Sequence, residues 1–182
     1  MTQPALKEWS AAVHALLDGR QTVLLRKGGI HEKRFSVAAP EFVLFPTIAH
    51  SHAERVRPEH HDLLAAAATD STKDAVTIRA CASVVAAVEV NRAEAIDELA
   101  DLHIWTADSI RADRIDFRPK HRLTVLVVQA APLQAAGRLP RIPDYGGCKS
   151  WVDLPMQPLR GEPVHELATL HDIAERVRRS VG

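Results

Sequence analysis

One segment of the chain, residues 75–90, constrains the fold more than any other. Apolar side chains occupy every second position, and most positions between them are polar or small. This period of two predicts a long β-strand with one drier and one wetter face, as is typical of antiparallel or curved sheets. The residues expected to share the drier face are Val76, Ile78, Ala80, Ala82, Val84, Ala86, Val88 and Val90.

Shorter patterns predict the remaining elements. Further strands are expected over residues 21–26, 35–37, 42–45 and 122–130. Helices are expected over residues 5–18, 53–69, 91–102, 106–115 and 164–180. Asn91 with Glu94 forms a capping-box pattern, and Thr106 is a second candidate cap. The prolines between residues 132 and 163 predict an irregular region.

The order of these elements indicates the fold class. Strands and helices are mixed, but the strict strand–helix–strand alternation of a doubly wound sheet is missing. We therefore expect an α+β fold, with a curved, largely antiparallel sheet or small barrel flanked by helices, and one domain over residues 1–182.

Composition excludes several classes of protein. The chain has 182 residues, 46% of them hydrophobic and 25% charged, which is typical of a globular domain and not of a disordered chain. Basic and acidic residues number 23 each, so only a local basic patch could attract nucleic acid. The N-terminus shows no signal-peptide pattern, and no apolar run is long enough for a membrane helix. We expect a cytoplasmic protein without membrane contact, whose oligomeric state the sequence does not indicate.

The two cysteines, Cys81 and Cys148, are too few for a disulfide framework or a zinc ligand set. We expect free thiols in a reducing compartment. Because Cys81 lies on the long alternating strand, we expect it to be protected from thiol reagents.

Basic residues form two candidate phosphate contacts. The segment Arg26-Lys27-Gly28-Gly29 lies at the end of a predicted strand, and its glycines would let backbone amides approach an anion; the alternative is a hairpin turn with solvated charges. Residues 111–122 hold the densest basic run, with Phe117 inside it, and the alternative is a solvated face diluted by Asp113 and Asp116. The expected phosphate-binding residues are Arg26, Lys27, Arg111, Arg118, Lys120 and Lys149.

The segment Tyr145-Gly146-Gly147-Cys148-Lys149-Ser150-Trp151 is the most unusual in the chain. Tyr145 and Trp151 could stack on a base beside Lys149, as aromatic residues do in sites for single-stranded nucleic acid. Two alternatives stay open: an ordered loop that places both rings in the core, and a nucleophilic Cys148.

Histidines suggest an alternative chemistry. His50, His52, His60 and His61 fall within twelve residues, a spacing at which imidazoles could bind a divalent metal. No H-E-x-x-H pattern is present, and Glu32-x-Arg34 only approaches the Glu-x-Lys pattern of metal-dependent nucleases. We predict no cofactor, with a divalent metal at His50 and His52 as the alternative to a polar, histidine-rich helix.

Five blocks in order resemble a bacterial family: A-L-K-E-W (5–9), R-K-G-G-I (26–30), F-P-T-x-x-H (45–50), H-I-W-T (103–106) and Y-G-G-C-K-S-W-V (145–152). That family is domain of unknown function number eighteen hundred and two, and it implies no activity, cofactor or catalytic residue. Residues 19–26 also resemble the G-x-K-x-x-E-x-R signature of ASCH domains, which are small PUA-like barrels linked to RNA. Gly19 and Arg26 match it, whereas Gln21 and Leu24 replace its lysine and glutamate.

Three functions follow as hypotheses. The first is a nucleic-acid or nucleotide-recognition domain with a basic cleft and aromatic stacking, whose partner is RNA, DNA or a nucleotide. The second is a metal-dependent hydrolase or nuclease that uses His50 and His52. The third is an interaction protein without chemistry, so the sequence leaves open whether the protein is an enzyme.

Overall fold

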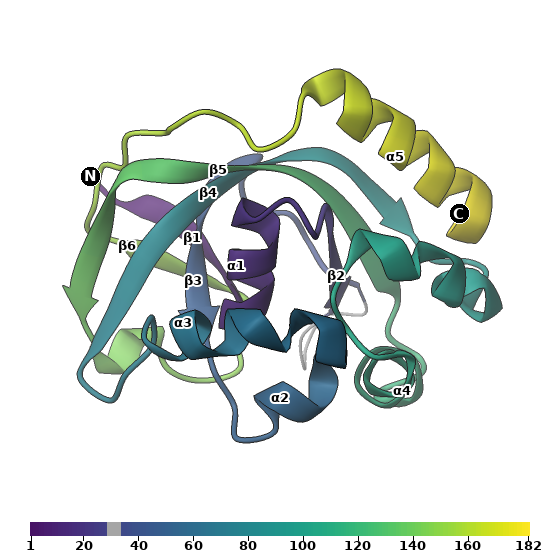
Figure 1. Ribbon diagram of the computed structural model, residues 1–182, viewed down its shortest axis with the longest axis horizontal. Coiled ribbons are helices and arrows are strands. Elements are labelled where there is room, and N and C mark those ends of the chain that lie inside the picture. The colour runs from purple at the N-terminus through teal and green to yellow at the C-terminus, as the bar shows by residue number, and fades with distance from the viewer. Residues whose placement is uncertain (29–33) are drawn as a thin grey trace.

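The computed structural model describes residues 1–28 and 34–182 (Figure 1). Its strands are β1 (Gln3–Trp9), β2 (Val23–Lys27), β3 (Glu41–Thr47), β4 (Ala75–Glu89), β5 (Leu123–Pro140) and β6 (Trp151–Leu154). They form one six-stranded sheet in the order β2-β5-β4-β3-β1-β6. Among the six described strands, β1 and β3 pair in parallel and the other neighbours pair antiparallel. The predicted α+β class with a largely antiparallel sheet is confirmed.

The helices are α1 (Ser10–Leu17), α2 (His52–Arg55), α3 (Leu64–Ala68), α4 (Ala107–Ile110) and α5 (Leu167–Val181). Other helical segments are the 3-10 helices η1 (Pro58–Leu63), η2 (Ala93–Leu102) and η4 (Pro143–Tyr145), and the π-helical turn η3 (Arg111–Asp116). Figure 1 shows β4 and β5 arching over α1, with α5 lying along their outer side. None of the helices described is long and apolar enough to cross a bilayer.

Two bulges shape the long strand β4. The register with β5 shifts between Ile78 and Ala80 and again between Val84 and Ala86. The extra residues lie on β5 at the first shift and on β4 at the second. The side chains of β4 turn to the opposite face after each shift, so the prediction of one continuous apolar face was wrong. The residues expected on that face instead belong to three separate apolar clusters. Val76 and Ile78 lie in one cluster, Ala80 and Ala82 lie in another, and Ala86 and Val88 lie in a third.

The bulges also bend the sheet, so that its first strand β1 and its edge strand β2 approach each other. The guanidinium of Arg26 on β2 donates a hydrogen bond to the backbone carbonyl of Lys7 on β1 at 2.8 Å, although the two strands are not paired. Inside the curl lies a cluster that includes Leu6, Leu24 and Leu126. The sheet is therefore strongly curved without being a closed barrel.

Several predicted elements differ from the observed ones. Residues 5–9 are strand and not helix, because β3 and β6 supply backbone partners on both sides of β1. The helix expected over 53–69 is broken, since Val56 is extended and Pro58 begins η1. Residues 35–37 form no strand.

The region expected to be irregular after residue 130 begins as strand instead. Strand β5 runs on to Pro140, and it accommodates Pro132 at its own irregularity, beside the first register shift with β4, where a missing N–H is tolerated. The predicted cap at Thr106 is confirmed, because its side chain accepts a hydrogen bond from the Ser109 amide. The cap expected at Asn91 is absent, and its side chain instead accepts a hydrogen bond from Arg122 at 3.3 Å.

Candidate functional site

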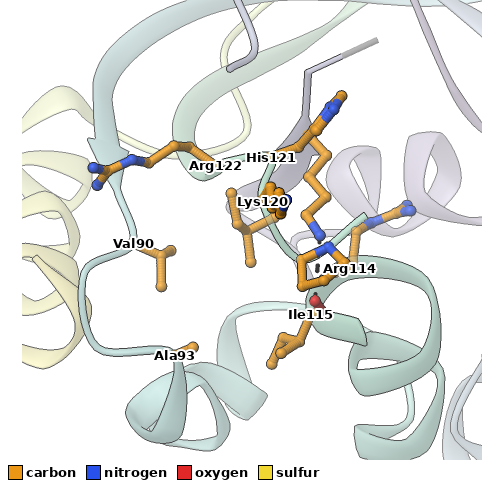
Figure 2. A pocket seen from close by; sticks show the side chains of 10 residues that line it. Val90, Ala93, Arg114, Ile115, Lys120, His121 and Arg122 are labelled. Carbon is orange, nitrogen blue, oxygen red and sulfur yellow. Dashed lines mark hydrogen bonds between the residues drawn. The ribbon is translucent and has the colours of Figure 1, made fainter. Parts of the chain in front are cut away.

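A basic hollow of about 180 Å³ lies where β2, η2, η3 and the start of β5 meet. Its polar lining consists of four cationic side chains and one histidine, and no carboxylate is found among the described residues that line it. Figure 2 shows Arg114 and Arg122 directed to opposite sides, with Lys120 and His121 between them. The full lining is Lys27, Val90, Ala93, Arg114, Ile115, Pro119, Lys120, His121, Arg122 and Leu123.

Lys27 holds one wall of the hollow in place. Its ammonium donates hydrogen bonds to the carbonyls of Ile115 at 3.3 Å, Phe117, and Arg118 at 3.0 Å, so it closes the end of η3. Burial, reinforced by nearby Arg114, lowers the pKa of Lys27 below its usual value. Because its three N–H groups are used within the fold, Lys27 contributes charge and support more than a free hydrogen-bond donor.

Lys120 is the cation most available to a ligand, whereas the Arg114 guanidinium is buried near the charges of Glu8 and Arg26. Neither side chain donates a hydrogen bond to any residue that the structure describes. Burial lowers the pKa of Arg114, with the Glu8 carboxylate acting in the opposite direction, yet an arginine stays charged at neutral pH. Lys120 is exposed at the rim. An anion in the hollow would give Lys120 a partner.

The other two basic residues are partly engaged. Arg122 donates to Glu89 at 2.9 Å, an exposed ion pair of the kind that contributes little to stability. His121 lies within 3.4 Å of the Gly28 carbonyl through its Nδ1. Arg122 thus retains donors on the rest of its guanidinium, which can reach a ligand at the rim.

A strained turn carries Lys120 and His121. Arg118 has a φ of 51°, the one non-glycine residue with positive φ among those described, and it directly precedes a proline. Both features are unfavourable for this residue, since left-handed backbone is rare outside glycine and pre-proline residues favour extended conformations. The Arg118 guanidinium covers the ring of Phe117, which is 56% exposed. An exposed aromatic ring therefore lies on the same turn as the rim of the hollow.

The structure separates Arg26 from this site. Its side chain points into the curl of the sheet, where it pairs with the buried carboxylate of Glu8 at 3.2 Å and lies over the ring of Phe35. Arg26 thus joins β2 to β1 and is only slightly exposed. Its neighbour Lys27 lies on the opposite face of β2 and reaches the hollow.

Arg111 and Lys149 are also outside the hollow. Arg111 pairs with Asp97 on η2 at 2.7 Å. Lys149 lies near Lys7, and burial together with the charges of Lys149 and Arg141 lowers the pKa of Lys7. No described hydrogen bond or ion pair joins Lys149 to Arg26. Lys7, Lys149 and Arg141 form a second cationic surface, which lies at the opposite end of β4 from the hollow.

The two aromatic residues expected to stack on a base have other surroundings. Tyr145 is only 5% exposed and packs edge-on against Phe45 at 5.5 Å, so its ring belongs to the core. Trp151 is half-buried, stacks on Phe35 at 6.0 Å, and donates from Nε1 to the Ser36 carbonyl at 3.1 Å. Residues 145–151 therefore match the alternative of an ordered loop whose aromatic rings pack against the rest of the fold.

The histidines do not converge. His50 is exposed, whereas His52 is buried between the rings of Trp9 and Trp105, and burial lowers its pKa to about 4. Within residues 1–28 and 34–182, no group of three or more His, Cys, Asp or Glu side chains could hold a metal. The divalent-metal alternative stays a prediction without a ligand set in the described part of the chain.

Two predictions from the sequence remain, one about Gly29 and Glu32 and one about the cysteines. Gly29 and Glu32 lie outside the described residues. Both cysteines are free, with Cys81 buried and Cys148 exposed. The basic run at 111–122 did point toward the hollow, but its apolar wall at Val90 and Ala93 had no signal in the sequence, because it comes from a different part of the chain.

Comparison with known proteins identifies the family of the chain. It belongs to the family described as "Domain of unknown function (DUF1802)", which matches residues 5–176, so the predicted family is confirmed. No curated protein matches it. The crystal structure of ASCH from Zymomonas mobilis is similar with a TM-score of 0.47 and 14% identity, covering 83% of this chain and 86% of that chain. A variant of the same Zymomonas mobilis protein gives a TM-score of 0.45 and 12% identity, covering 94% of each chain.

An ASCH protein is thus among the similar structures, as the second resemblance led us to expect. At TM-scores this low, the likeness carries no argument about function. The function has to be argued from the hollow itself.

Proposed function

We propose that the protein recognises a nucleic-acid strand and that the basic hollow contacts its phosphates. The observation that carries this proposal is the lining, which has four cations, one histidine and no carboxylate among its described residues. A chain with equal numbers of basic and acidic residues has no general attraction for polyanions, so such a local excess of positive charge is informative.

The exposed ring of Phe117 supplies the aromatic contact that this function requires. It lies beside the hollow on the turn that also carries Lys120, and a base could stack on its free surface. This assignment replaces Tyr145, whose ring is enclosed in the core.

The test is a titration of labelled single-stranded RNA and DNA, followed by fluorescence anisotropy at several salt concentrations. Each phosphate contact releases counterions, so the logarithm of the affinity falls linearly with the logarithm of salt. Replacing Lys120 with alanine should reduce that slope by about one, because the variant loses one phosphate contact. Lys73→Ala, at the opposite end of β4, is the matched control and should leave the slope unchanged.

Two results would contradict the proposal. One is the absence of binding to every strand at low salt. The other is a slope that responds to Lys149→Ala and not to Lys120→Ala, because the second cationic surface would then be the site.

A further inference from the structure

Most of the charged groups around the hollow are already engaged within the fold. Lys27 donates to three backbone carbonyls, and Arg122 pairs with a carboxylate of β4. The Arg114 guanidinium is buried, and Figure 2 shows it and Arg122 directed to opposite sides of the hollow. Lys120, which is exposed at the rim, is left as the side chain that can bind a phosphate directly, and the remaining donors of Arg122 can add a second contact.

This small number of contacts limits the length of strand that the site can cover. Proteins that follow a single strand over many nucleotides combine a long basic groove with several stacking side chains. The hollow has a volume of about 180 Å³, and Phe117 is the one Phe, Tyr or Trp among the described residues whose side chain is largely exposed. One or two phosphates and a single base are therefore what the described residues can contact.

Phe117 places an aromatic surface beside the phosphate contact. It precedes the strained turn that carries Lys120, which is closed by a hydrogen bond from the His121 amide to the Arg118 carbonyl at 2.9 Å. The Arg118 guanidinium lies over the Phe117 ring, 4.8 Å from its centre, yet Phe117 is still 56% exposed. A base can stack on the ring while a phosphate of the same nucleotide, or of its neighbour, binds Lys120.

A base that stacks on Phe117 has to be unpaired. In a duplex the neighbouring base pairs cover both faces of each base, so proteins read it from its grooves with an inserted helix or ribbon and many phosphate contacts. In a single strand the bases can turn outward and stack on aromatic side chains. The contacts of Phe117 and Lys120, which are few and lie beside a depression, match the second mode.

We infer that the site recognises one or two nucleotides of a single strand, with a phosphate at Lys120 and an unpaired base on Phe117. This inference rests on the proposed function and narrows it from nucleic acid in general to unpaired nucleotides with a short footprint.

The experiment measures how affinity depends on strand length and on base pairing. Unlabelled single strands of about four to about sixteen nucleotides, and a duplex of the longest one, displace a labelled single strand from the whole chain in a fluorescence-anisotropy assay. Each affinity is divided by the number of positions on the strand at which the protein can bind. We expect this value to vary by less than about twofold across the single strands, and the duplex to compete roughly tenfold more weakly because its bases cannot stack on the protein. The salt slope should be about 0.7–1.4, since each phosphate contact on a single strand contributes about 0.7.

Phe117→Leu tests the stacking contact. Leucine keeps an apolar side chain but has no ring, so the affinity for single strands should fall at least about fivefold while the salt slope stays the same. Phe117→Tyr keeps the ring and should bind like the wild type. Leu159→Ala, which shortens an exposed apolar side chain on the segment after β6, is the matched control and should leave both values unchanged. Melting curves check that all three variants are folded.

The possible outcomes separate the inference from the proposed function. Equal affinity for the duplex, or an affinity per position that rises steadily with length and has a salt slope above about 3, would overturn the inference and leave the proposed function standing. Equal binding by Phe117→Leu and the wild type would also overturn the inference, since no base would then stack on this ring. The absence of binding by any strand would overturn both.

Discussion

Acid should destabilise the protein through His52, and the structure allows the size of this effect to be worked out. The imidazole is buried among Trp9, Trp105 and Arg55, and its Nε2 has no hydrogen-bond partner among the described residues. Burial, reinforced by the charge of Arg55, lowers its pKa to about 4, against 6.5 in an unfolded chain. The folded state therefore binds this proton less readily than the unfolded state does.

The direction of the effect follows from that difference. The contribution of the neutral His52 imidazole to the free energy of unfolding is fully present above about pH 6.5. This contribution is lost as the pH falls toward 4. At about pH 5 the unfolded chain is protonated at this site and the folded chain is not, which costs about 2 kcal/mol. His103 on the segment after η2 is buried in a similar way, with a pKa also lowered to about 4, and it adds a similar amount.

The assay is urea unfolding at about pH 7.5 and about pH 5, compared between the wild type and His52→Phe. Phenylalanine keeps an aromatic ring between the two tryptophans but cannot be protonated, so the variant should lose about 2 kcal/mol less than the wild type on acidification. His171→Phe, at an exposed position of α5, is the matched control and should keep the full loss. An identical loss of unfolding free energy on acidification in the wild type and in His52→Phe would show that His52 is not the group responsible.

Three further predictions concern stability and accessibility. Lys27→Met removes the three hydrogen bonds that close η3 and should lower the free energy of unfolding by about 1–3 kcal/mol, measured in urea. Tyr145→Ala should cost about 3–5 kcal/mol in the same assay while leaving the salt dependence of RNA binding unchanged, since its ring packs in the core. A thiol reagent should modify Cys148 quickly and Cys81 only on unfolding, whereas two fast thiols would contradict the burial of Cys81.

Patterns in the sequence predicted those parts of the fold that depend on interactions between residues close together in the chain. The period of two over 75–90 identified β4, and the helical spacing near the C-terminus identified α5 (Leu167–Val181). Thr106 was found as a cap because its bond to the Ser109 amide spans only three residues. Alternation could not reveal the two register shifts of β4, since these are set by its pairing with β5.

Elements that depend on distant partners were missed. Residues 5–9 have helical spacing of apolar residues, yet they form a strand because β3 and β6 lie on either side. The same limit applies to the candidate site. Lys27 and Lys120 were expected phosphate contacts and do meet at the hollow, whereas Arg26, one residue before Lys27, points to the opposite face. Neither the strand face of Arg26 nor the position of Ala93 in the same hollow as the basic run can be inferred from neighbouring residues in the sequence.

The central claim, that a nucleic-acid strand binds at the basic hollow, is tested most directly by amide hydrogen exchange on the protein with and without saturating RNA. Binding slows exchange where it covers or steadies the backbone. We expect slower exchange over residues 114–123 and 90–93, where the hollow lies, and unchanged exchange over residues 145–152. Protection over 145–152, with none over 114–123, would contradict the claim and move the site to the surface formed by Lys7, Arg141 and Lys149.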